Sequence, residues 1–413
     1  MTTLHFNTSN KVLSGEINLP SSKSITNRAL ILKYLARNSF SILNQSLADD
    51  SVLLDNTLKQ LHVLSRNKLT NEIFIDNAGT AMRFLTALLS ITKGNWSLTG
   101  SERMKERPIK GLVDTLNQLG AQISYQDNIG FPPIQIKGNT IKGGSATIET
   151  NTSSQFITSV LLIAAFLENG LLLTFNGKIV SKPYFTLTLK MLDYFGIKYS
   201  FINNCIVIKK QAFQSKDIFI ESDWSAASYW YEMAALSENV ELKLNGLSNS
   251  GWQGDAIIAE LFKEFGVNTE FLNDGVSLSK TKSRVKSFSF DFTDYPDIAP
   301  TVAVCCAGLG VNAELKGLGG LIIKECNRLH ALETELRKIG CNVNIINNNT
   351  LLIEPSIINS QEIIHTYNDH RMAMSFAPLS IVFGKLNLDN IQVVKKSYPG
   401  FWNDLQRVGF KID

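Results

Sequence analysis

The sequence predicts an α/β protein of two domains, each built from three repeated helix-and-strand units. Three observations predict this fold. The length of 413 residues exceeds what one hydrophobic core usually organises. Two kinds of helix recur along the chain at intervals of about 70 residues. Short alternating segments with asparagine-rich turns follow one of these helices and favour β-hairpins.

The first kind of helix is amphipathic and is followed by a glycine. Apolar residues three and four positions apart favour a helix in segments such as LVDTLNQLGAQI and LETELRKIGCNV, and glycine suits the position after a helix C-terminus. Segments such as FINNCIVI and IINNNTLLI then predict hairpins. The glycines recur 69 to 76 residues apart, at Gly120, Gly196, Gly266, Gly340 and Gly409.

The second kind of helix is apolar on all sides and begins at small or polar residues, which predicts a helix inside a domain. The first copy, near Ser24, is shorter than the others and lacks a predicted hairpin, with His62 in place of the glycine. The five later starts are 70 to 74 residues apart, at Gly79, Ser153, Asp223, Asp297 and Asp369.

Two independent sets of landmarks that keep one phase favour a true repeat over the weak periodicity of ordinary two-layer α/β proteins. We therefore expect an inside-out α/β barrel in each domain, with helices inside, sheets outside and pseudo-threefold symmetry. Residues 20–224 are predicted to form one domain, and residues 1–19 with 225–413 the other.

Composition excludes several functional classes. The net charge is only +3, from 40 basic and 37 acidic residues, so neither nucleic acid nor an anionic membrane is expected as a partner. The five cysteines include no CxxC pair, and no phosphate-loop or HExxH motif occurs. No signal peptide and no apolar run of about 20 residues is evident. We expect a soluble, cytoplasmic, monomeric protein without metal or cofactor.

Basic residues gather where the apolar helices begin. Helix N-termini carry unpaired N–H groups and bind anions. Serine, threonine, asparagine and aspartate at such positions are usually only helix caps. Lys23, Arg28 and Arg371 fit capping poorly, because a cation opposes the helix dipole unless an anion lies nearby. Asp223 and Asp297 suit capping, and Asp297 could also serve as a base.

Further basic segments precede the glycine-capped helices, and each could equally be a solvated loop or a charged helix start. Pro108 at a helix start would direct Arg107 out of that terminus. Lys324, Arg328 and Lys396 lie in comparable segments. Several fixed cations together would suit a ligand with phosphate and carboxylate groups.

The motifs resemble those of the 5-enolpyruvylshikimate-3-phosphate (EPSP) synthase family through essentially the whole chain. The most specific are NAGTAMR, RMKERPI and NDHRMAM, and LPSSKSITNRALIL, KECNRLHALETELRKIG and KKSYPGFW agree with them. The resemblance implies two domains of three repeated units with the active site in the cleft between them. It also implies transfer of the enolpyruvyl group of phosphoenolpyruvate to the 5-hydroxyl of shikimate 3-phosphate, with release of phosphate.

The resemblance also implies site residues. Those for shikimate 3-phosphate would be Lys23, Ser24, Arg28, Ser153, Ser154, Gln155, Ser181, Tyr184, Asp297 and Lys324. Those for phosphoenolpyruvate would be Lys23, Gly79, Arg107, Gln155, Arg328, Arg371 and Lys396. Proton transfer is expected from Asp297 and Glu325, with Lys23 assisting.

Three departures from the family pattern bear on this reading. Gly320 stands where the family commonly has a phosphate-binding asparagine, Cys326-Asn327 replaces a usual Thr-Asp, and Phe84 stands where proline is frequent. Gly79 is retained, which predicts inhibition by glyphosate. The alternatives are the related UDP-N-acetylglucosamine enolpyruvyl transferase, a non-enzymatic polyanion-binding repeat protein and an inactive relative. The first usually has Lys-Asn at the position of Lys23-Ser24.

Overall fold

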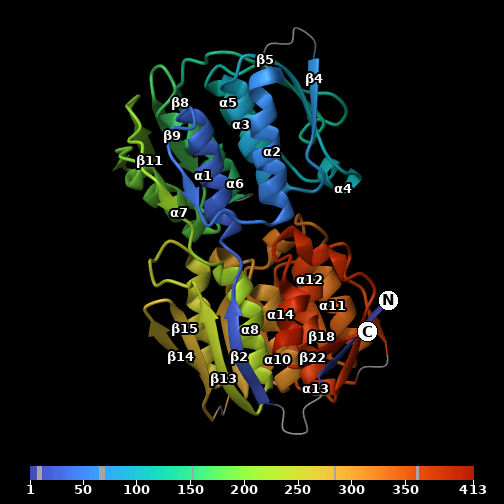
Figure 1. Cartoon of the computed structure of the whole chain (residues 1–413). Helices are drawn as coiled ribbons and strands as arrows, with labels where there is room; N and C mark the ends of the chain where they lie inside the picture. The colour runs from blue at the N-terminus through green and yellow to red at the C-terminus, as the bar shows by residue number, and fades with distance from the viewer. Residues whose placement is uncertain (7–11, 65–69, 151–152, 283–284, 360–361) are drawn as a thin grey trace. The chain divides into compact units, whose positions relative to one another are not determined.

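The computed structural model describes residues 1–6, 12–64, 70–150, 153–282, 285–359 and 362–413 (Figure 1). They divide into two compact units. Unit 1 comprises Met1–Ser22, Leu47–Asp49 and Glu221–Asp413, and unit 2 comprises Lys23–Ser46 and Asp50–Ile220. The predicted division, 20–224 against 1–19 with 225–413, places the boundaries a few residues away and assigns Leu47–Asp49 to the domain of residues 20–224, whereas the structure groups this segment with unit 1.

One strand order is shared by five four-stranded sheets in the described residues: two parallel strands at one edge and two antiparallel strands at the other. The antiparallel pair is a hairpin in four of these sheets, and in the fifth its two strands come from the two ends of the chain. In unit 2 these sheets are β4 (Thr70–Phe74), β5 (Gly94–Thr99), β7 (Ile134–Gly138) and β6 (Ile123–Tyr125), and β8 (Gly144–Glu149), β9 (Leu171–Asn176), β11 (Cys205–Ile208) and β10 (Ser200–Ile202). In unit 1 they are β2 (Val12–Asn18), β13 (Asn239–Asn245), β15 (Gly275–Lys280) and β14 (Val267–Leu272); β16 (Ser287–Asp291), β17 (Asn312–Lys316), β19 (Thr350–Glu354) and β18 (Asn342–Ile346); and β20 (Ile363–Ile364), β21 (Lys385–Leu388), β1 (Thr2–Phe6) and β22 (Phe410–Ile412).

The sixth sheet is the short first copy. It has only the parallel pair β3 (Ile42–Leu43) and β12 (Ile218–Phe219), without a hairpin in the described part of the chain. The predicted loss of a hairpin is therefore confirmed. A cavity of about 470 Å³ lies next to this sheet, lined by residues such as Tyr34, Ser41 and Asp217. Phe213, from the segment that leads to β12, stacks on Phe40, which lines this cavity, and on Phe195.

Each unit has three inner helices that pack on one another. They are α1 (Lys23–Leu35), α3 (Gly79–Ile91) and α6 (Ser154–Ala164) in unit 2, and α8 (Trp224–Leu236), α10 (Ala299–Leu309) and α12 (His370–Phe376) in unit 1. Most of their residues are buried, as the all-round apolar pattern predicted. The three sheets of each unit stay separate and do not join into a closed barrel in the described residues. The expectation of helices inside and sheets outside is confirmed in this looser form.

The remaining helices and short helical turns complete the two units. These elements are α2 (Asp49–Leu64), α4 (Glu102–Lys105), α5 (Lys110–Gln118), α7 (Lys182–Tyr194), α9 (Ile258–Glu264), α11 (Arg328–Lys338), α13 (Ser380–Phe383), α14 (Phe401–Arg407), η1 (Gly254–Ile257), η2 (Phe292–Asp294), η3 (Gly319–Leu321), η4 (Ala377–Leu379) and η5 (Gln392–Lys396). All five predicted capping glycines have positive φ, from +77° to +100°. A left-handed residue ends a helix most easily as glycine, which explains their recurrence. No helix in the described ranges is long and apolar enough to cross a membrane.

Candidate active site

The predicted helix starts hold, with one exception. Ser153 caps α6 by accepting from Gln155 N, Asp223 caps α8, and Asp369 caps α12 by accepting from Arg371 N at 2.9 Å. The interpretation of Asp297 as a helix cap was wrong. α10 begins two residues later, at Ala299, and its N-cap residue is Ile298, which makes no side-chain capping hydrogen bond. Because Asp297 is not used as a cap, its carboxylate is available to other partners.

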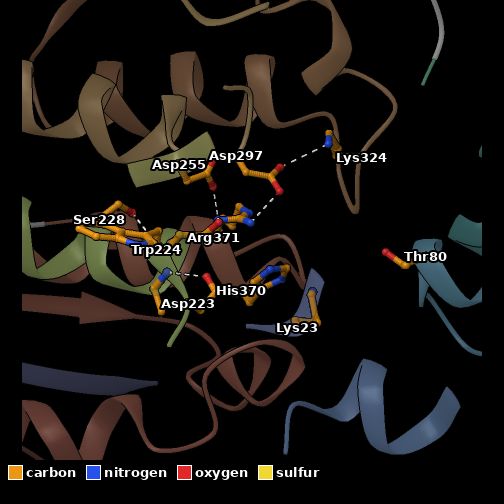
Figure 2. A network of polar contacts seen from close by, with 12 residues as sticks. Lys23, Thr80, Asp223, Trp224, Ser228, Asp255, Asp297, Lys324, His370 and Arg371 are labelled. Atoms are coloured by element: carbon orange, nitrogen blue, oxygen red, sulfur yellow. Dashed lines mark hydrogen bonds and ion pairs between the residues drawn. The ribbon is translucent and has the colours of Figure 1, made fainter. Parts of the chain in front are cut away.

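Asp297 is the centre of a cluster of charged residues in unit 1. Its Oδ2 lies 2.8 Å from Nη2 of Arg371, and its Oδ1 lies 3.3 Å from Nζ of Lys324 (Figure 2). Nη1 of Arg328 lies 3.5 Å from the same Oδ1. We call Asp297, Lys324, Glu325, Arg328, Asp369 and Arg371 the Asp297 cluster. Four of its members were predicted from the resemblance as ligands, and the structure brings these four together.

Electrostatics keep Asp297 ionised. Burial raises the pKa of its carboxyl, but the charges of Arg371, Lys324 and Arg328 act in the opposite direction and outweigh burial. The net pKa lies well below the ordinary value. The cations gain a shared counter-ion, which an anionic ligand could partly replace.

Arg328 is the most deeply buried cation of the cluster, with 1% of its surface exposed. Its guanidinium grips Asp369 with two hydrogen bonds, from Nε at 2.7 Å and from Nη2 at 3.1 Å, and Nη2 also donates to Glu325 at 2.7 Å. Burial lowers the pKa of Arg328, but Asp369 and Glu325 raise it by more. Two carboxylates thus hold one arginine permanently charged.

The other side of Arg371 contacts groups that the sequence did not single out. Its Nη1 donates to the hydroxyl of Tyr229 at 3.4 Å, and burial raises the pKa of this tyrosine to about 12. Asp255 lies near enough to Asp297 and Arg371 to interact with both. Its carboxylate accepts a hydrogen bond from Ser225, and its pKa is raised to about 6, mainly by burial and by the negative charge of Asp297.

Lys23 begins α1 in unit 2 and pairs with a carboxylate that the sequence analysis did not identify. Its Nζ lies 2.9 Å from Oδ2 of Asp50, in the first turn of α2. Both side chains are largely buried, with 16% and 6% of their surfaces exposed. This pairing fixes the ammonium group at the helix start.

Arg28 is surrounded by protein oxygens. Nε donates to Thr188, Nη1 to the carbonyl of Ser24, and Nη2 to Thr158 and to the carbonyl of Tyr184. Its guanidinium carbon also lies 5.6 Å from the centre of the Phe84 ring. Burial lowers its pKa to about 10. Arg28 therefore links α1, α6 and α7, whether or not it also binds a ligand.

Gly79 and Arg107 are in direct contact. A Cβ placed on Gly79 would lie 2.6 Å from Nη2 and 2.8 Å from Nη1 of Arg107, so only glycine leaves room for the guanidinium. Nη1 of Arg107 donates to the carbonyl and to the side chain of Asn77, each at 3.3 Å. The expectation that Pro108 lies at a helix start was wrong, because α5 begins at Lys110. Arg107 is instead held by Asn77, at the start of α3.

Gln155 reaches the same turn, since its Nε2 donates to Thr80 at 3.2 Å. Ser181 precedes α7 with a left-handed backbone, φ +52°, and Ser154 begins α6. Lys396 ends η5 in unit 1. A Cβ on Gly320 would meet open space, with no described atom within 4 Å.

Several partners of the predicted residues were missed, among them Asp50, Tyr229, Asp255, and Asp369 as the partner of Arg328. Asp369 had a usable signal, because it directly precedes His370-Arg371, but the same signal fits a cap equally well. The pairing of Asp50 with Lys23 joins two helices and carries no sequence signal.

Comparison with known proteins decides the family. A model of the family described as EPSP synthase (3-phosphoshikimate 1-carboxyvinyltransferase) matches residues 8–405. The chain belongs to this family. The 3-phosphoshikimate 1-carboxyvinyltransferase of Bacteroides fragilis strain YCH46 is 43% identical over 404 residues, covering 97% of this chain and 96% of the relative. The enzyme of the same name from Sulfurovum sp. strain NBC37-1 is 34% identical over 419 residues, covering 96% and 97%.

Solved structures agree at the level of the fold. The structure of EPSP synthase from Acinetobacter baumannii, solved at 2.37 Å, covers all of both chains with a TM-score of 0.76 and 20% sequence identity. A second structure of that protein gives a TM-score of 0.75. The α/β, two-domain fold predicted from the sequence is thus the fold of the family.

Proposed function

We propose that this chain transfers the enolpyruvyl group of phosphoenolpyruvate to the 5-hydroxyl of shikimate 3-phosphate. The observation that best supports the proposal is that the Asp297 cluster sets three cations around the carboxylate of Asp297, in a chain whose relatives carry the name of this reaction. Both substrates are polyanions, and arginine binds phosphates and carboxylates with two parallel hydrogen bonds.

The proposed ligand residues are those implied by the resemblance. Shikimate 3-phosphate would be held by Lys23, Ser24, Arg28, Ser153, Ser154, Gln155, Ser181, Tyr184, Asp297 and Lys324. Phosphoenolpyruvate would be held by Lys23, Gly79, Arg107, Gln155, Arg328, Arg371 and Lys396. Support comes from the direct contact of Gly79 with Arg107 and from the shared partner of Arg328 and Arg371. Arg28 would bind a ligand only through an N–H group that does not already donate to a protein oxygen.

The proposed reaction is an addition followed by an elimination. The 5-oxygen forms a bond to C2 of phosphoenolpyruvate and gives its proton to a base, while C3 gains a proton and becomes a methyl group. The methyl group then loses a proton, the bond from C2 to the phosphate oxygen breaks, and phosphate leaves. Asp297 and Glu325 are the proposed proton-transfer groups, with Lys23 assisting at the phosphate.

Asp297 with three cations around it is a weak base. Substrate anions that draw on the same cations would weaken their hold on the carboxylate and raise its pKa toward the range where it accepts a proton. Binding of the anionic substrates would in this way prepare the base.

Three further expectations stay proposals: inhibition by glyphosate, a cytoplasmic location and a monomeric state. Among the alternative functions, transfer to UDP-N-acetylglucosamine is disfavoured by Ser24, which replaces the asparagine usual in that family. A polyanion-binding role is disfavoured by the burial of Arg28, Arg107, Arg328 and Arg371, since nucleic-acid binding uses exposed cations.

Phosphate release tests the proposal. We expect turnover only with phosphoenolpyruvate and shikimate 3-phosphate together, and none with UDP-N-acetylglucosamine as acceptor. Lys23→Met and Glu325→Ala should each lower kcat by about 100-fold or more. Lys59→Met removes a largely exposed ammonium that pairs with Asp55, and is the control with wild-type turnover. Wild-type turnover in Lys23→Met or Glu325→Ala would remove that residue from the proposed mechanism.

A further inference from the structure

Arg83 lies one turn into α3 and joins two segments that are distant in sequence. Its Nη2 donates to the carbonyl of Pro108 at 2.9 Å, and its Nη1 donates to the carbonyl of Gly79 at 3.2 Å. Nη1 also lies 3.6 Å from the sulfur of Met104, which is fully buried. One guanidinium therefore connects the first turn of α3 with the loop that carries Arg107.

This connection sets the spacing of the two residues proposed to hold phosphoenolpyruvate in unit 2. The carbonyl of Gly79 accepts a hydrogen bond from Arg83, and so does the carbonyl of Pro108. Pro108 directly follows Arg107 in the chain. The guanidinium of Arg107 lies against Gly79 with no room for a methyl group. The position of the segment that carries Arg107 therefore decides how closely this guanidinium lies against Gly79.

Arg83 itself has 4% of its surface exposed. Its guanidinium contacts groups of the first turn of α3 and of the segment from Met104 to Pro108. We propose that Arg83 is a positioning residue that holds Arg107 in place for phosphoenolpyruvate. The inference rests on the proposed function, because Arg107 is there taken as a ligand of that substrate.

Lysine cannot replace arginine in this role. The planar guanidinium directs its N–H groups along fixed directions and can reach both carbonyls at once, whereas an ammonium group is a single point of charge on a flexible stem. Arg83→Lys should therefore keep the charge and lose the connection. The matched control is Arg103→Met, which removes a cation of the neighbouring helix α4 that pairs with Glu106, the residue that follows this helix.

Steady-state kinetics of Arg83→Met and Arg83→Lys test the inference. We expect KM for phosphoenolpyruvate to rise about tenfold or more, as for a lost charged hydrogen bond, with KM for shikimate 3-phosphate within about twofold. Arg103→Met should leave both constants near wild type. The double variant Arg83→Met with Arg107→Met should have the same KM for phosphoenolpyruvate as Arg107→Met alone, because Arg83 acts through Arg107. Equal rises for both substrates, or effects that multiply in the double variant, would overturn the inference.

A crystal structure of Arg83→Lys decides the same question without turnover, so that loss of the proposed function and loss of this inference are distinguishable. We expect the Arg107 guanidinium to leave Asn77 and Gly79. Arg107 in its original place in that variant would overturn the positioning role even in an active enzyme.

Discussion

Oδ2 of Asp297 lies 2.8 Å from Nη2 of Arg371, so the proposed base is paired with a proposed ligand of phosphoenolpyruvate. This pair explains why a carboxyl group whose burial alone would raise its pKa instead has a pKa far below the ordinary value. It also means that the pKa of Asp297 depends on which other groups Arg371 binds.

Ligand binding should raise the pKa of Asp297. Carbon-13 NMR of the aspartate carboxyl groups measures this, with Asp297→Asn used to assign the signal. In the free protein the signal should stay that of a carboxylate through the acid range in which the fold persists. Saturation with shikimate 3-phosphate, which Lys324 is proposed to bind, should move its titration to higher pH. A titration that is the same with and without the ligand would show that the cations hold Asp297 unchanged.

Gly79→Ala should weaken phosphoenolpyruvate binding. The added methyl group would lie 2.6 Å from Nη2 of Arg107, so the guanidinium must move. We expect KM for phosphoenolpyruvate to rise about tenfold or more, as for one displaced charged hydrogen bond, with KM for shikimate 3-phosphate little changed. The same variant should need much more glyphosate for half-inhibition than the wild type does. Wild-type protein that needs millimolar glyphosate at low phosphoenolpyruvate would contradict the prediction of inhibition.

Asp369→Asn should destabilise unit 1. It leaves the buried charge of Arg328 with fewer partners, and breaking a buried ion pair on one side typically costs about 3–5 kcal/mol. Glu333→Gln is the control, because it breaks a pair with the half-exposed Arg337 on the same helix and should cost less than about 1 kcal/mol. Urea unfolding monitored by tryptophan fluorescence measures both. An equal decrease in the free energy of unfolding in the two variants would mean that the buried pair contributes no more to stability than a surface pair.

Glu232 should make stability depend on pH. This residue of α8 is fully buried, and neither of its carboxyl oxygens has a hydrogen-bond partner among the described residues. Burial raises its pKa well above 4.5. A raised pKa contributes stability that is present below the unfolded-state pKa and is lost as pH rises through the folded-state pKa. Each unit of difference is worth about 1.4 kcal/mol.

Glu232→Gln removes this titration, so the free energy of unfolding of the variant should increase relative to that of the wild type as pH rises from 5 to 9. Denaturant unfolding across that range measures this change, and Glu241→Gln, which removes an exposed carboxylate from β13, is the matched control. A free-energy difference that is constant with pH would contradict the prediction.

The repeat was the part of the fold that the sequence could predict well. Helices and hairpins depend on local apolar spacing and on residues such as Gly120 and Gly340, whose positive φ requires glycine. The missing hairpin of the first copy followed from the same spacing. Register within the sheets was not predicted, because it depends on strands that are far apart in the chain, such as β1 and β22.

The sequence predicted which residues belong to the candidate site better than it predicted the contacts among them. The resemblance supplied Arg328, Arg371 and Lys324, and the structure adds that all three meet at Asp297. The expectation that Asp297 caps a helix was wrong, because a local rule was applied to a residue whose partners come from other segments. The pairing of Lys23 with Asp50 and the enclosure of Arg28 were beyond prediction for the same reason.

Conversion of phosphoenolpyruvate labelled with carbon-13 at C2 and C3, followed by NMR in the presence of shikimate 3-phosphate, tests the proposed activity most directly. We predict that both labelled carbons appear in an enol ether on the 5-oxygen of shikimate 3-phosphate, with one phosphate released for each product molecule. Labelled carbons that stay in phosphoenolpyruvate, or that appear as pyruvate with phosphate released, would contradict the proposed transfer.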